Sequence, residues 1–181
     1  MRRRGFPLWR FSLRLYRMPG VAKTCLNLQD RKGADVNLLL YCCWMGLQGR
    51  RLSTRSLRSV MATVAAWQRD VVRPLRQARR ATRKRETGIA EPWMERLHAR
   101  IGVAELDAEY VEQLVLAGYA AGMPPLARRH EPRSAAAVNV RRYLELSDAG
   151  IGRSEIRHLR ALLDAAWSAR GRLRLVRCAS V

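Results

Sequence analysis

Hydrophobic and polar positions follow the spacing of amphipathic helices along most of the chain, and no long run shows the alternation of a half-buried strand. One stretch departs from that spacing, because every residue from 38 to 47 (LLLYCCWMGL) is apolar or glycine. A helix without a polar face must be covered by other helices on all sides. The pattern therefore predicts an all-α fold, a compact multi-helix bundle of seven or eight helices around a buried central helix at about residues 35–48.

Start and stop signals place two helices before the central one. Apolar residues at helical spacing predict helices at about residues 7–17 and 21–32. Gly33 is a natural stop for the second helix. Asp35 has the position and chemistry of an N-cap, since its carboxylate can accept hydrogen bonds from the amides of the first turn.

Other signals bound the next elements. We expect Gly46 and Gly49 to end the central helix, and Ser53 to cap a long helix that continues to about residue 84. Pro74 lies inside this helix and is expected to kink it, because proline lacks the amide donor and its ring collides with the preceding turn.

The second half of the chain also reads as helical. Gly102 is expected to separate two helices, and three prolines mark a loop before the next pair. The predicted helices and the loop are residues 92–102, 103–121, 122–134 (loop), 136–146 and 155–168. This organisation predicts an N-terminal helical bundle at residues 1–86, a C-terminal helical part at 92–169 packed on it as one domain, and a basic tail at 170–181.

The formal net charge is +20, and it is concentrated in the first half of the chain. Residues 1–90 hold 21 Lys or Arg against 4 Asp or Glu, and the remainder holds 14 against 11. Such a field attracts polyanions, which include nucleic acids and acidic protein surfaces. The strong preference for arginine over lysine is also what a GC-rich genome imposes, so the charge alone does not identify a partner.

Five arginines supply the candidate for polyanion or partner binding. Their spacing of four, three, four and three places them on one side of a helix over about 20 Å. They are Arg69, Arg73, Arg76, Arg80 and Arg83. The alternative is a solvated charged face that serves solubility alone.

A polar cluster before the central helix is a second candidate site. Gln29, Asp30, Asp35 and Asn37 bring two carboxylates and two amides to the junction of two predicted helices. Oxygen donors of this kind can hold a divalent cation or a cationic group. The competing interpretation, which we favour, is structural: Asp35 caps, Asp30 pairs with an arginine and Asn37 satisfies turn amides.

Four cysteines are present, at positions 25, 42, 43 and 178, and none forms a C-x-x-C pair. Their setting predicts buried reduced thiols and a cytoplasmic protein without a transmembrane segment. An N-terminal signal sequence is not expected, because Arg10, Arg14 and Arg17 interrupt the apolar region that it would need. We expect no metal, no cofactor and no catalytic residues, since the chain holds no nucleophile elbow, phosphate loop or metal-binding spacing.

Two motifs in the first half resemble the signature of a family of small bacterial proteins, a domain of unknown function. The motifs are W-x-F-S-L-x-L-Y and L-Q-D-x-x-G-x-D-V-N-L-L-L with a following Trp. They are carried here by Trp9, Phe11, Ser12, Leu13, Leu15 and Tyr16, and then by residues 28–30, Gly33, residues 35–40 and Trp44. The resemblance implies a compact helical bacterial protein and implies no activity.

These observations favour a non-enzymatic helical interaction or regulatory protein that binds an acidic partner. The alternative is a nucleic-acid-binding protein that uses the Arg69–Arg83 face or a helix-turn-helix-like hairpin at residues 141–168. In that hairpin Gly150 and Ile156 fall at expected positions, whereas Leu146 is larger than the motif prefers. An enzyme is a third and less favoured hypothesis.

Overall fold

The computed structural model describes residues 5–83, 91–147 and 161–168, and these form an all-α structure. The helices are α1 (Pro7–Tyr16), α2 (Val21–Lys32), α3 (Val36–Leu47), α4 (Thr54–Trp67), α5 (Arg73–Ala81), α6 (Glu91–Ala121) and α7 (Pro132–Leu146). Residues 161–168 are also helical, and a π-helical turn, η1 (Gln68–Val72), joins α4 to α5. The prediction of a multi-helix bundle is confirmed.

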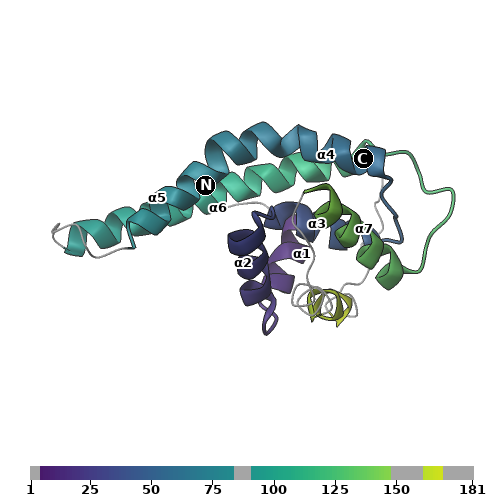
Figure 1. Ribbon diagram of the computed structural model, residues 1–181, viewed down its shortest axis with the longest axis horizontal. Coiled ribbons are helices and arrows are strands. Elements are labelled where there is room, and N and C mark those ends of the chain that lie inside the picture. Colours follow the sequence, from purple (N-terminus) through teal and green to yellow (C-terminus); the bar gives the residue numbers. More distant parts are fainter. Residues whose placement is uncertain (1–4, 84–90, 148–160, 169–181) are drawn as a thin grey trace.

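Two long helical segments give the molecule its shape (Figure 1). The continuous segment α4–η1–α5 runs alongside α6 in the opposite direction, and the α5–α6 pair extends beyond the rest as an arm. Helices α1, α2, α3 and α7 pack together on one side of this pair. In the part of the chain that the structure describes, no helix is both long and apolar enough to cross a membrane.

Helix α3 is the buried centre that its apolar sequence predicted. Eleven of its twelve residues are buried, and Asp35 caps it by accepting from the backbone amides of Asn37 and Leu38. Cys25, Cys42 and Cys43 are buried free thiols, and burial raises the pKa of each.

Gly46 does not end the central helix as expected, because α3 continues to Leu47. A Cβ atom at Gly46 would lie only 2.2 Å from the backbone N and Cα of Ala136 in α7. This glycine therefore permits the close approach of two helices. The reversal falls instead at Gly49, whose φ of 81° suits glycine.

The expected break at Gly102 is wrong, because α6 is one helix of 31 residues. An interior glycine disfavours a helix by only about 1 kcal/mol, which packing against α3, α4 and α5 outweighs. The following loop also ends earlier than predicted. Helix α7 starts at Pro132, where Glu131 caps it by accepting from the amides of Arg133 and Ser134.

Pro74 is accommodated by the π-helical turn that precedes it. The amide of Arg73 donates to the carbonyl of Gln68, five residues earlier, so the turn holds an extra residue. This turn absorbs the missing donor and the bulk of the proline ring without ending the helical segment. It also changes the register between Arg69 and the arginines of α5.

Candidate functional site

A cleft of about 400 Å³ lies where α5 and α6 meet α1, α2 and α3. A smaller cavity of about 150 Å³ lies beside it, between the end of α2, the start of α3 and the η1–α5 segment. Gln29 and Arg76 line both spaces, so Arg76 forms part of the wall between them. This junction is the most polar part of the described interior and is the candidate functional site.

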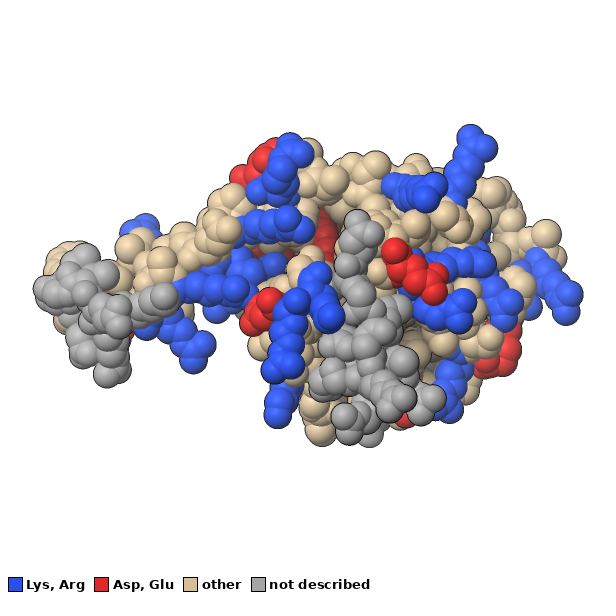
Figure 2. All heavy atoms as spheres, viewed as in Figure 1, with Lys and Arg blue, Asp and Glu red and all other residues tan. Residues whose placement is uncertain are grey.

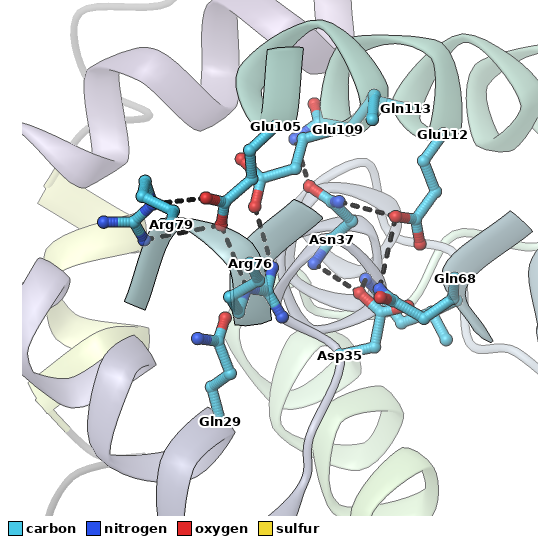
Figure 3. A network of polar contacts seen from close by, with 12 residues as sticks. Gln29, Asp35, Asn37, Gln68, Arg76, Arg79, Glu105, Glu109, Glu112 and Gln113 are labelled. Carbon is cyan, nitrogen blue, oxygen red and sulfur yellow. Dashed lines mark hydrogen bonds and ion pairs between the residues drawn. The ribbon is translucent and has the colours of Figure 1, made fainter. Parts of the chain in front are cut away.

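Four charged side chains from α5 and α6 form one side of the cleft (Figure 3). Arg76 donates from Nε to Glu105 Oε1 at 3.1 Å and from Nη2 to Glu109 Oε1 at 2.9 Å. Arg79 also binds Glu105, so two arginines converge on one buried carboxylate. Burial raises the pKa of Glu109, and the charge of Arg76 opposes that shift. The four charges largely neutralise one another.

A chain of buried amides links α1, α6, α3 and η1. Ser12 donates to Gln113 Oε1 at 2.9 Å, and Gln113 donates to Asn37 Oδ1 at 2.8 Å. Asn37 donates in turn to Glu112 Oε2 at 2.8 Å, and Gln68 donates to the same oxygen at 3.3 Å. Figure 3 shows Asn37 between Gln113 and Glu112, where both ends of its amide are used. This layer fixes how α3 meets α6.

Glu112 is fully buried, with 0% of its surface exposed, and lies next to Asp35. Burial, and then the negative charge of Asp35, raise the pKa of Glu112 far above its ordinary value. The raised pKa favours the neutral form of Glu112 at pH 7, and its carboxyl group accepts hydrogen bonds from the side-chain amides of Asn37 and Gln68. Asp35 Oδ2 and Glu112 Oε1 are both buried, and neither has a hydrogen-bond partner among the described residues. Asp35 lies at the N-terminus of α3, where the helix dipole favours a negative charge.

The five arginines of the predicted face do not form one exposed row. Arg76 is buried against Glu105 and Glu109, Arg80 pairs with Asp30, and Arg69 pairs with its neighbour Asp70. Arg73 and Arg83 are exposed and form no ion pair with a described residue. The side of α5 that carries Arg76 and Arg80 faces carboxylates on α6 and α2, which helical spacing alone cannot show.

The predicted polar cluster is also divided. Asp35 caps α3 and Asp30 pairs with an arginine, as the structural interpretation held. Asn37 does not satisfy turn amides; its side chain reaches across to α6. Gln29 faces the cleft near Arg76. The structure thus brings the polar cluster and the arginine face, predicted as separate sites, to one junction.

Sequence reasoning missed the polar residues of α6. Glu105, Glu109, Glu112 and Gln113 recur at helical spacing on the side of α6 that also holds the buried Ala108 and Leu116. Acidic residues on the apolar side of a helix are a signal of buried partners, and they were identifiable before the fold was known. Among the described residues, no group of three or more His, Cys, Asp or Glu side chains is arranged to hold a metal ion. The helix-turn-helix-like prediction at 141–168 depends on residues 148–160, which lie outside the described residues.

Comparison with known proteins gives one match. The model of a family described as "Protein of unknown function (DUF2390)" matches residues 7–116. No curated protein and no solved structure matches the chain. The matched range contains α1 to α5 and most of α6, and so includes every residue that lines the cleft and the cavity.

Proposed function

The chain belongs to this family of proteins of unknown function, DUF2390, and on that premise we propose that it is a non-enzymatic interaction protein that binds an acidic partner. The binding surface consists of Arg73, Arg80 and Arg83, with Arg69 at one end and Arg76 behind them. The partner is an acidic protein surface, which the positive field of the chain attracts and orients.

The observation that carries the proposal is the state of Arg73 and Arg83. Both side chains are exposed, and neither forms an ion pair with a described residue. Arg73 and Arg80 also line the same cavity of about 150 Å³, together with Gln29 and Gln77. Figure 2 shows that basic side chains far outnumber acidic ones on the face that it presents, which favours attraction of an acidic partner.

An acidic protein fits this surface better than a nucleic acid does. A duplex presents phosphates at regular intervals and is matched by a continuous row of free cations. Here Arg76 is buried and Arg69 and Arg80 have carboxylate partners, so the free charges are few and separated. Nucleic-acid binding remains the alternative, favoured by the net charge of +20.

The proposal can be tested with polyglutamate and a DNA duplex as probes. We expect polyglutamate to bind at low salt, and the double substitution Arg73→Glu and Arg83→Glu to weaken binding about tenfold or more. The matched control is Arg55→Glu and Arg58→Glu on α4, two exposed arginines whose reversal changes the net charge equally. Equal losses in both double variants would show a non-specific charge effect and contradict the proposal.

The DNA duplex tests the alternative through salt dependence. With Arg76 buried, at most four arginines of this face can meet phosphates, so the slope of log K against log salt should be no steeper than about −3.6. Binding of DNA that is tighter than that of polyglutamate, and that Arg73→Glu and Arg83→Glu remove, would establish the nucleic-acid function instead.

A further inference from the structure

Three exposed leucines from three helices converge on the 400 Å³ cleft. Leu13 of α1 is 40% exposed, Leu26 of α2 is 43% exposed and Leu106 of α6 is 37% exposed, and all three line the cleft. Single exposed leucines are ordinary on protein surfaces, but apolar side chains that gather around one hollow mark a binding surface. Trp9, Tyr16 and Leu40 also line this space, so it has an apolar lining as well as its charged side.

Basic side chains flank these leucines. Arg10 of α1 lies about one turn before Leu13, and Arg17, the C-cap residue of α1, lies about one turn after it. Lys23 lies about one turn before Leu26 on α2. All three are exposed and form no ion pair with a described residue. The carboxylates inside the cleft are already held, Glu105 by Arg76 and Arg79 and Glu109 by Arg76. The cleft therefore has apolar walls, and Arg10, Arg17 and Lys23, called the basic rim, lie close to its lining residues in the chain and form no ion pair with a described residue.

The dimensions suit the side of a helix. Residues of α6 line the cleft from Gly102 to Gln113, a length of about 16 Å at 1.5 Å per residue, or three helical turns. Gly102 has no side chain and so leaves space at the cleft. A Cβ atom at this position would already be in van der Waals contact with Arg79, 3.5 Å from its Cδ. A partner helix with apolar residues at positions i, i+4 and i+7 has its anchors within this length.

We propose that the cleft receives an acidic amphipathic helix of the partner protein. Its apolar side chains insert between Leu13, Leu26 and Leu106, and its acidic side chains lie against the basic rim. This inference rests on the proposed function and specifies the partner: acidic on one side, apolar on the other, and helical when bound. Charge complementarity selects this partner over a basic or neutral one.

The probe is a labelled synthetic peptide of about 16 residues, long enough to form a helix, with leucines on one helical face and glutamates on the other. The comparison peptide has the same composition in an order that spreads the leucines around the helix. Fluorescence anisotropy should show binding of the amphipathic peptide at least about tenfold tighter than that of the scrambled one. Equal affinity for both peptides, or no binding of either, would overturn the inference.

Substitutions then locate the peptide. Leu13→Gln with Leu26→Gln should weaken binding about tenfold or more, and both changes are on the surface, where the fold tolerates them. Leu97→Gln with Val115→Gln is the matched control, because these α6 residues are 47% and 40% exposed but do not line the cleft. Reversal of Arg10 and Arg17 to glutamate should weaken binding and reduce its salt dependence. An unchanged affinity after the cleft substitutions would overturn the inference.

Three further outcomes separate the possibilities. In the first outcome, polyglutamate binding depends on Arg73 and Arg83, but peptide binding is unchanged by substitution of Leu13 and Leu26. This result would overturn the inference and leave the proposed function intact. Failure of polyglutamate and peptide alike would overturn both. Decanoate that binds in the cleft when the amphipathic peptide does not would identify a small amphiphile as the occupant and also overturn the inference.

Discussion

Helix α3 meets α7 and α6 through interfaces of different character. Toward α7 it packs backbone against backbone, with Gly46 on Ala136 and no room for a side chain. Toward α6 it uses Asn37, whose amide is held between Glu112 and Gln113. The first interface combines this close packing with hydrogen bonds from Asp35 N to Tyr143 and from Asn139 to the Cys42 carbonyl. The second depends on the side-chain hydrogen bonds of Asn37. The cleft opens only on the polar side, so the two interfaces separate the part of α3 that supports the fold from the part that borders the candidate site.

The largest expected effect breaks the close-packed interface. Gly46→Ala places a Cβ atom 2.2 Å from the backbone of Ala136, so α3 and α7 must move apart to relieve the clash. We expect a loss of about 3 kcal/mol or more in the free energy of unfolding, measured by urea denaturation. The control is Gly118→Ala in α6, where a Cβ meets no atom within 4 Å. That change should raise stability by up to about 1 kcal/mol, and equal losses in both variants would contradict the packing argument.

A smaller effect follows from breaking the charged side of the cleft. Arg76→Met leaves Glu109 without its cation, and leaves Glu105 to Arg79 alone. A buried carboxylate without its partner is costly, and we expect a loss of about 2–3 kcal/mol by the same measurement. Arg141→Met removes an exposed pair with Glu145 and should cost less than about 0.5 kcal/mol. Similar losses of unfolding free energy in the two variants would show that the buried ion pairs of Arg76 stabilise the fold no more than an exposed pair does.

The smallest expected effect, near pH 5, concerns the proton held by Glu112. Because the folded pKa of Glu112 is raised, the folded state keeps a proton that the unfolded state loses above a pH of about 4.3. The Glu112 contribution to the free energy of unfolding must therefore fall as pH rises from there toward the raised pKa. Glu112→Gln resembles the neutral acid, so we expect a change of less than about 1 kcal/mol near pH 5 and a flatter pH dependence above it.

The companion variant for this proton is Asp35→Asn. Asparagine caps a helix as well as aspartate but carries no charge, so this change should cost about 0.3–1 kcal/mol through the lost interaction with the dipole of α3. Urea denaturation between pH 5 and pH 9 measures both variants. If Glu112→Gln kept the wild-type pH slope, Glu112 would not be the group that holds the proton.

Local chemistry explains which parts of this molecule were predictable. The ends of α2, the Asp35 cap of α3 and the Ser53 cap of α4 depend on residues within one turn, and each was found from the sequence. The continuity of α6 through Gly102 was missed because it depends on packing partners from other helices.

The candidate site also has features that the sequence predicts and features that depend on contacts between distant residues. The arginines and the polar cluster were found as residues, but their meeting at one junction was not. That meeting depends on Asp30 pairing with Arg80 across fifty residues, and on Arg76 facing Glu105 and Glu109 of α6. Helical spacing shows which residues share a face, but it does not show what that face meets. The acidic residues among the apolar positions of α6 were the one signal of this arrangement in the sequence.

The most direct test of the account is an NMR titration of the protein with the acidic amphipathic peptide, in which the amide shifts of all helices are followed together. The account predicts shift changes concentrated at the cleft residues of α1, α2 and α6 and around Arg73, Arg80 and Arg83, with α7 and the outer side of α4 unchanged. Changes confined to α7, or spread evenly over the basic surface, would contradict it.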